Sequence, residues 1–226
     1  YASSLTEFVD LDGDGDLDLS WGDYFQQSLY IIWNSGTPES PEMYEVTTQY
    51  PSNDPIISAG QNMPTFADLD GDGDDDLFVT VLSGAYGNQL VNNFYYYKNT
   101  GSNSNPEYSY ITNNYFSTLD IFSNSSPELI DIDNDGDLDL FICGRVIPHE
   151  YPFPATSYLL ENKLEDGILK FEIVNDILSP EFNNLGLVSD ALWTDVDNDN
   201  LVDLIIVGEF MPITIFKNHK TFFERL

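Results

Sequence analysis

Four clusters of aspartates carry the residue types best suited to chemistry in this sequence. The third reads "DIDNDGDLDL", with Asp131, Asp133, Asp135 and Asp139 at its positions 1, 3, 5 and 9. Alternate carboxylates on a tight loop can turn toward one centre, and Ca²⁺ accepts about six to eight oxygens in a flexible cage. Glycine at position 6 permits the bend, and a main-chain carbonyl near position 7 can complete the set. The pattern predicts calcium rather than Mg²⁺, which demands near-ideal octahedral geometry; the alternative is a solvated acidic turn.

The same cluster occurs four times along the chain. The clusters start at Asp10, Asp68, Asp131 and Asp195, with spacings of 58, 63 and 64 residues. They hold 20 of the 39 acidic residues, so the charge is concentrated where a counter-charge would be needed. The fourth has Asn200 in place of the glycine, and because asparagine tolerates positive φ, we expect this site to bind with lower affinity.

Short apolar runs flank every cluster and predict the elements that position it. "TEFV", "PTFA", "PELI" and "ALWT" precede the clusters, and "DLSWG", "LFVTV", "LFICG" and "LIIVG" follow them. A third run closes at Asn34, Asn99, Asn162 or Asn218, and a fourth, aromatic run follows each. Four short strands in each of four units predict an all-β β-propeller of four-stranded antiparallel blades. A β-sandwich is the weaker alternative, because it does not require the same loop chemistry in every unit.

The predicted organisation is a single β-propeller region over residues 1–226. Its approximate blades are residues 1–50, 51–115, 116–178 and 179–226. Continuous apolar runs such as "LIIVG" predict strands buried on both faces. Four units could close as a ring, or they could be part of a larger propeller of about six to eight blades.

An EF-hand is the competing calcium motif, and the sequence excludes it. An EF-hand needs a bidentate acid at position 12 of the loop and flanking helices. Position 12 is apolar in all four clusters: Trp21, Val79, Ile142 and Ile206. The loops are therefore predicted to join two strands.

This pattern, D-h-D-x-D-G-x-x-D-h between two strands, resembles the calcium loop of FG-GAP/VCBS repeats, as in the propeller of integrin α subunits. The run "GLVSDALWTDVDNDNLVDLIIVGEFMPITIFKN" also resembles blades of secreted bacterial proteins that carry such repeats. The resemblance implies about one Ca²⁺ per repeat, up to four, held by side chains at positions 1, 3, 5 and 9 and the carbonyl at position 7. The implied ligands are Asp10, Asp12, Asp14, Asp16 (carbonyl) and Asp18; Asp68, Asp70, Asp72, Asp74 (carbonyl) and Asp76; Asp131, Asp133, Asp135, Asp137 (carbonyl) and Asp139; and Asp195, Asp197, Asp199, Leu201 (carbonyl) and Asp203.

Composition narrows the classes of partner. The chain of 226 residues has 39 acidic and 7 basic side chains, a formal charge of −32, so nucleic acid and anionic membrane surfaces would be repelled. A hydrophobic content of 42% supports a packed core rather than a disordered acidic chain. No apolar run reaches the roughly 18–20 residues that span a bilayer, so membrane insertion is not expected. The start at Tyr1 suggests a fragment or processed chain, with further blades of the same parent as possible partners.

The blade ends opposite the aspartate loops carry long segments rich in aromatic residues. Strand alternation places the links between second and third strands, and between blades, at that end. Rigid aromatic rings with polar neighbours suit protein or glycan recognition. The candidate ligand residues are Trp21, Tyr24, Tyr86, His149, Tyr151 and Phe153. For any one of these rings, packing onto the blade edge is the alternative.

The sequence offers little support for catalysis. It lacks the G-x-S-x-G, H-E-x-x-H and P-loop motifs, and Cys143 lies within a predicted strand as a structural thiol. We therefore expect a calcium-stabilised propeller of a secreted or cell-surface protein, from a bacterium, that acts in adhesion or molecular recognition and not as an enzyme. A glycan-binding lectin is the alternative, followed by a glycoside hydrolase or polysaccharide lyase that uses loop carboxylates outside the calcium sites.

Overall fold

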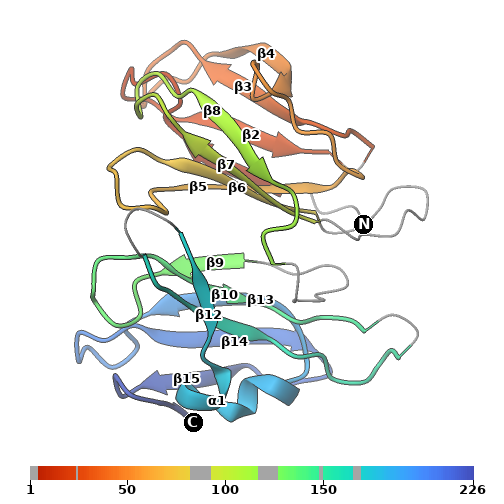
Figure 1. The fold of residues 1–226 in the computed structure, drawn as a ribbon, viewed down its shortest axis with the longest axis vertical. Coiled ribbons are helices and arrows are strands. Elements are labelled where there is room, and N and C mark those ends of the chain that lie inside the picture. Colours follow the sequence, from red (N-terminus) through yellow and green to blue (C-terminus); the bar gives the residue numbers. More distant parts are fainter. Residues whose placement is uncertain (1–4, 24, 82–92, 117–126, 148–149, 165–168) are drawn as a thin grey trace. The chain divides into compact units, whose positions relative to one another are not determined.

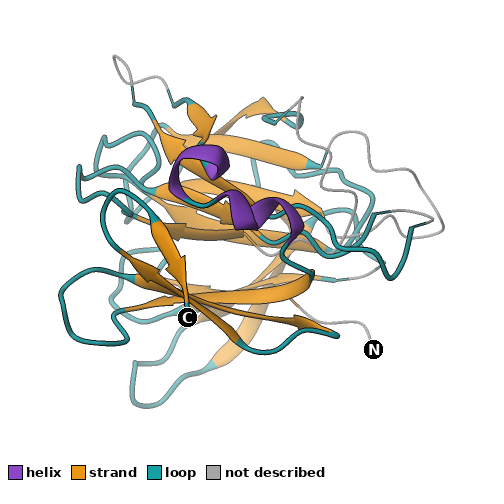
Figure 2. Cartoon of the chain, turned by 90° about the horizontal axis from the view of Figure 1, so that it is seen from below, coloured by secondary structure: helices purple, strands orange, loops and turns teal. Residues whose placement is uncertain are grey.

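In the computed structural model the regular secondary structure is almost entirely β-strand (Figures 1 and 2). It describes residues 5–23, 25–81, 93–116, 127–147, 150–164 and 169–226. Four four-stranded antiparallel sheets form, and in each the strands follow one another in chain order. The predicted class is confirmed: the protein is all-β, with four blades of the kind that build propellers.

The chain divides into two compact units, of which unit 1 covers residues 1–68 and 72–119. Its blade 1 consists of β1 (Leu5–Val9), β2 (Asp18–Gly22), β3 (Leu29–Asn34) and β4 (Met43–Tyr50). Its blade 2 consists of β5 (Asn62–Ala67), β6 (Asp76–Val81), β7 (Phe94–Asn99) and β8 (Tyr108–Thr112). The two blades share one hydrophobic core, to which Leu29, Ile31, Leu77, Val79, Tyr95 and Tyr97 contribute.

Unit 2 covers residues 69–71 and 120–226. Its blade 3 consists of β9 (Pro127–Ile130), β10 (Asp139–Ile142), β11 (Tyr158–Asn162) and β12 (Phe171–Ile173). Its blade 4 consists of β13 (Leu187–Thr194), β14 (Asp203–Glu209), β15 (Thr214–Asn218) and β16 (Phe223–Arg225). Their common core includes Phe141, Cys143, Leu159, Leu204, Ile206 and Phe216. Cys143 is buried, as expected of a structural thiol, but it lies one residue after the end of β10 rather than within the strand.

A short helical connection joins the two blades of unit 2. It contains α1 (Asn175–Leu178) and a 3₁₀ turn (Pro180–Asn184). Phe182 from this turn is fully buried against Phe141 and Phe216, with ring centroids 5.5 and 4.9 Å away. Among the described residues, no helix has the length and apolar character needed to cross a membrane.

Burial on both faces holds for the inner strands but not for every apolar run. All residues of β6 and β10 are buried, as predicted. The run "LIIVG" in β14 differs, because Leu204 and Ile206 enter the core whereas Val207 is 36% exposed. The other face of β14 is therefore only partly covered by the described residues, and the prediction for this strand was wrong.

Candidate functional site

Each aspartate cluster forms the hairpin loop between the first and second strands of a blade. We call residues 10–18 loop 1, residues 68–76 loop 2, residues 131–139 loop 3 and residues 195–203 loop 4. In each loop the last residue begins the second strand: Asp18 begins β2, Asp76 β6, Asp139 β10 and Asp203 β14. The structure confirms the prediction that each cluster lies between two strands.

Backbone conformation explains the small residues inside these loops. Position 6 is left-handed in all four, with φ of +95° at Gly15, +94° at Gly73, +99° at Gly136 and +69° at Asn200. Position 4 is also left-handed, occupied by Gly13, Gly71, Asn134 and Asn198. Glycine and asparagine are the residues that adopt this region at least cost, so Asn200 preserves the bend in loop 4.

The first aspartate organises each loop through backbone hydrogen bonds. The amide of position 6 donates to its carboxylate in every loop, at 3.1 Å for Asp10, 3.0 Å for Asp68, 3.2 Å for Asp131 and 3.0 Å for Asp195. The amide of position 7 donates to the aspartate at position 5, at 2.9–3.1 Å. These bonds curl the chain so that carboxylates gather inside the loop.

The gathered carboxylates form four groups able to hold a metal ion. In each group the oxygens lie within 4.8 Å of one another. The groups are Asp10, Asp12 and Asp14; Asp68, Asp70 and Asp72; Asp131, Asp133 and Asp139; and Asp195, Asp197 and Asp199. Three loops therefore bring positions 1, 3 and 5 together, and loop 3 brings positions 1, 3 and 9. The carbonyls of Asp16, Asp74, Asp137 and Leu201 remain predicted ligands.

The position-9 aspartates have a structural role that the sequence did not reveal. All four are at most 1% exposed, and each accepts a 2.8 Å hydrogen bond from the backbone amide that ends the third strand of its blade, at Asn34, Asn99, Asn162 or Asn218. In loops 1, 3 and 4 the second carboxylate oxygen accepts from the amide of position 2, as Asp139 does from Ile132 at 2.8 Å. In loop 2 the Tyr96 hydroxyl donates to Asp76 instead. This aspartate thus clamps the loop to the blade.

Three of the four asparagines also bond to the loop through their side chains. The side-chain amides of Asn99, Asn162 and Asn218 donate to the carbonyl just before the position-9 aspartate, at 3.1–3.3 Å. The side-chain oxygens of Asn34 and Asn99 each accept two amides from the following turn. Sequence reasoning assigned these residues only to turns. Their recurrence at the end of the third run in all four units was the signal that could have linked them to the loops.

The electrostatics of loops 1 and 3 favour a bound cation. Burial raises the pKa of Asp139 to about 7, against two hydrogen bonds that lower it, and burial also raises the pKa values of Asp18 and Asp16. The Oδ1 atom of Asp16 is buried without a hydrogen-bond partner among the described residues. Clustered carboxylates that are costly to ionise in isolation are stabilised as anions by a nearby divalent cation. Together with the all-oxygen donor set, these groups fit a hard cation such as Ca²⁺.

Two lysines already place positive charge beside the loops. The Lys98 ammonium lies 3.0 Å from Asp72 in loop 2. Lys217 contacts both Asp197 and Asp199 in loop 4, the latter at 3.1 Å, and its hydrogen bond to Asp197 raises the pKa of its ammonium. An ammonium between two carboxylates of a candidate metal site would compete with a metal ion for the same oxygens. Lys217 is therefore a second reason, besides Asn200, to expect weaker binding in loop 4.

Replacing Lys217 by methionine (K217M) is expected to raise the calcium affinity of loop 4 about five- to tenfold, since it removes a positive charge at contact distance. Calorimetric calcium titration of the parent and the variant measures this change. Lys170→Met is the matched control, because Lys170 pairs with Glu172 at 2.9 Å, outside the loops. A lower affinity in K217M would mean that Lys217 organises the loop rather than competing in it.

The candidate ligand residues occupy different environments. Trp21 is half-buried on β2, where its ring lies 5.6 Å from that of Tyr30, so it belongs to the blade surface rather than to a loop. Tyr151 and Phe153 are 54% and 65% exposed in the link between β10 and β11. Tyr24, Tyr86 and His149 lie outside the described residues.

Comparison with known proteins agrees with this fold. No curated protein matches the chain. An Agrocybe aegerita lectin, described as recognising non-reducing terminal N-acetylglucosamine, aligns over 96% of this chain and 49% of its own, with 16% identity and a TM-score of 0.55. The V. cholerae biofilm matrix protein Bap1 aligns over 98% of this chain and 30% of its own, with 18% identity and a TM-score of 0.39. The chain thus spans about half the length of the lectin. Because the sequence identity is 16%, the likeness to the lectin shows a similar fold and nothing further.

The sequence also matches a known repeat family. The FG-GAP-like repeat aligns with residues 10–79 and again with residues 68–142. These two matches include loops 1, 2 and 3 and together cover more than half of the chain. With its four blades and recurring aspartate loops, the chain belongs to the family of FG-GAP-like repeat proteins.

Proposed function

We propose that this chain is a calcium-stabilised recognition module of a secreted or cell-surface protein. The observation that carries the proposal is the fourfold recurrence of one loop, with the same left-handed positions, a group of three gathered carboxylates and a position-9 aspartate bonded to the end of the third strand. Calcium at extracellular, roughly millimolar concentration would fill even weak sites of this type. Four Ca²⁺ would bring the formal charge from −32 to −24.

In this proposal the metal is structural and the ligand binds elsewhere. Each clamp ties its loop to the end of the third strand, so an ion in the loop would stiffen three strands of the blade at once. The opposite ends of the strands carry exposed aromatic side chains, including Tyr151, Phe153 and Phe210. Exposed rings on a rigid sheet can bind a partner with little loss of conformational entropy.

We further propose that the chain is not catalytic. Among the described residues, His219 is engaged by Glu224 at 2.9 Å and by the ring of Phe222 at 4.6 Å, and Cys143 is fully buried. The clustered carboxylates are assigned to metal binding. The lectin with the same fold supports glycan recognition as the first ligand class to test.

The experiment that tests this function is capture on surfaces coated with glycoproteins or polysaccharides, in millimolar Ca²⁺ and in excess EGTA. We expect saturable capture in calcium, loss of capture in EGTA at the lower temperature at which the metal-free chain unfolds, and no products released from the polysaccharides. Capture that is indifferent to chelation, or steady release of products, would contradict the proposal.

A further inference from the structure

Phe210 adopts a conformation that the fold does not explain. It follows the last residue of β14, has φ of +58°, and is 84% exposed. A bulky side chain in the left-handed region costs free energy, and an exposed ring recovers little by burial. Strain of this kind points to a functional role when the surrounding structure holds it in place.

The residue after Phe210 anchors this turn. Met211 packs against the core of unit 2 and against two glycines. A side-chain carbon added at Gly208 would lie 2.3 Å from the Leu187 carbonyl oxygen and 2.5 Å from Met211 Sδ; at Gly186 it would lie 2.8 Å from Sδ. The backbone beneath Phe210 is thus held by close contacts, and the ring is presented to solvent from a fixed turn.

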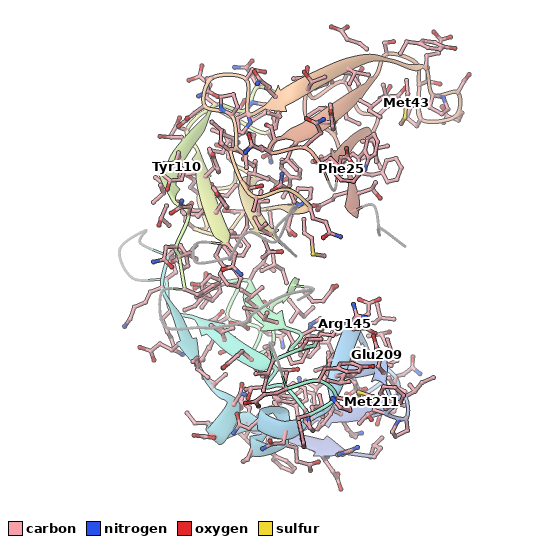
Figure 3. The ribbon with its side chains drawn as sticks, turned by 90° about the vertical axis from the view of Figure 1, so that its right-hand side faces the viewer. Phe25, Met43, Tyr110, Arg145, Glu209 and Met211 are labelled. Atoms are coloured by element: carbon pink, nitrogen blue, oxygen red, sulfur yellow. The ribbon has the colours of Figure 1, made fainter. Side chains whose placement is uncertain are left out.

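Two side chains from the β10–β11 link of blade 3, Arg145 and Tyr151, contact Glu209 and Phe210 of blade 4. The Tyr151 ring lies 6.4 Å from the Phe210 ring at 61°, and its hydroxyl donates to Glu209 Oε2 at 3.2 Å. The other Glu209 oxygen accepts from Arg145 Nη2, and this hydrogen bond lowers the pKa of Glu209. Arg145 and Glu209 approach one another beside Met211 in Figure 3. We call Arg145, Tyr151, Glu209 and Phe210 the aromatic platform.

The platform lies at the strand ends away from the aspartate loops of its own unit. Arg145 comes three residues after the end of β10, and Glu209 is the last residue of β14, whereas loops 3 and 4 adjoin the first residues of these strands. The amide of Val188 donates to the Gly144 carbonyl at 3.1 Å, which ties blades 3 and 4 together beside Arg145. This is the end that the sequence assigned to ligand binding.

We propose that the aromatic platform binds a neutral saccharide. The C–H face of a pyranose packs against the electron-rich face of an aromatic ring. The hydroxyl groups of the same sugar can donate hydrogen bonds to a carboxylate and accept them from a guanidinium. Arg145 and Glu209 neutralise each other, and the chain carries a formal charge of −32, so an acidic saccharide is disfavoured. This assignment rests on the proposed recognition function and gives it a location and a ligand class.

The test measures binding of the full chain, in millimolar Ca²⁺, to an array of neutral and acidic oligosaccharides, with the melting temperature of every variant recorded. Phe210→Asn removes the ring and suits the left-handed backbone, so we expect neutral-glycan binding about tenfold weaker with a melting temperature equal to or above that of the parent. Tyr151→Phe keeps the ring and removes the hydroxyl, and should weaken binding to a smaller extent. Phe25→Ala, which removes a 62% exposed ring in unit 1, is the matched control and should bind like the parent.

Three results would overturn the assignment. The first is a parent protein that binds no glycan or only acidic glycans. The second is glycan binding like that of the parent in both the F210N and the Y151F variants. The third is an F210N variant that melts at a lower temperature than the parent, because the ring would then stabilise the fold. A parent stabilised by calcium that binds only proteins would refute the saccharide site and leave the proposed function intact. A parent whose melting ignores calcium would refute the proposed function itself.

Discussion

Removal of calcium is expected to lower the melting temperature of this protein by more than about 10 °C. A site with free calcium at about 100 times its dissociation constant adds about 2.7 kcal/mol to folding, and each kcal/mol shifts the melting of a domain this size by about 2–4 °C. Two filled loops would already produce this shift, and four would exceed it. Without metal, loop 3 also retains Asp133 and Asp139, whose pKa values burial raises, so that both are costly to ionise.

The measurement is thermal unfolding in millimolar Ca²⁺, in excess EGTA, and in EGTA followed by calcium restored above the chelator. Magnesium at the same concentration is the control. It should restore the melting temperature less than calcium does, because a flexible all-oxygen cage suits Ca²⁺ better than Mg²⁺, which demands near-ideal octahedral geometry. A melting curve that is the same in EGTA and in calcium would refute a structural role for the loops.

Asp139→Ala is expected to be the most damaging single substitution in the loops. The Asp139 carboxylate is 1% exposed and accepts the amides of Ile132 and Asn162, both at 2.8 Å. Its removal leaves two buried donors without their acceptor, at a cost of about 2–5 kcal/mol even without metal. Denaturant unfolding in EGTA measures this cost.

Asp133→Ala provides the matched control in the same loop. Asp133 belongs to the same carboxylate group as Asp139 but is exposed, and its carboxylate accepts only the amide of Asp135, at 3.2 Å, among the hydrogen bonds of the described residues. We expect D133A to lose about 1 kcal/mol or less in EGTA and to show its larger loss in calcium. Equal losses for the two variants in EGTA would refute the separate structural role of the position-9 aspartate.

The blades and the loops could be predicted from the sequence because both repeat. Alternating aspartates at one spacing, followed by an apolar run, define a hairpin wherever they occur, and four occurrences define the blade. The clamp was not predicted, because spacing alone does not reveal that Asp139 accepts a hydrogen bond from the amide of Asn162, 23 residues away. Lys217 was missed for the same reason, as its contact with loop 4 depends on strand register between β14 and β15.

The ligand end was predicted less completely. Tyr151 and Phe153 were named from their loop and are exposed, whereas Trp21 lies on a strand beside Tyr30. Phe210 and Glu209 were missed, because "GEFMP" reads as the end of an apolar strand followed by a turn. The positive φ of Phe210 and the pairing of Glu209 with Arg145 depend on tertiary structure and leave no local pattern.

The most direct test of this account is the number of calcium ions that the chain binds. Metal-free protein would be titrated with Ca²⁺ by isothermal calorimetry, and the bound metal would be counted after removal of free ions. We predict saturation at four ions per chain, one for each loop, with loop 4 filling last because Lys217 contacts its carboxylates. Uptake of less than one ion per chain, from protein that is folded and calcium-free at the start, would contradict the account.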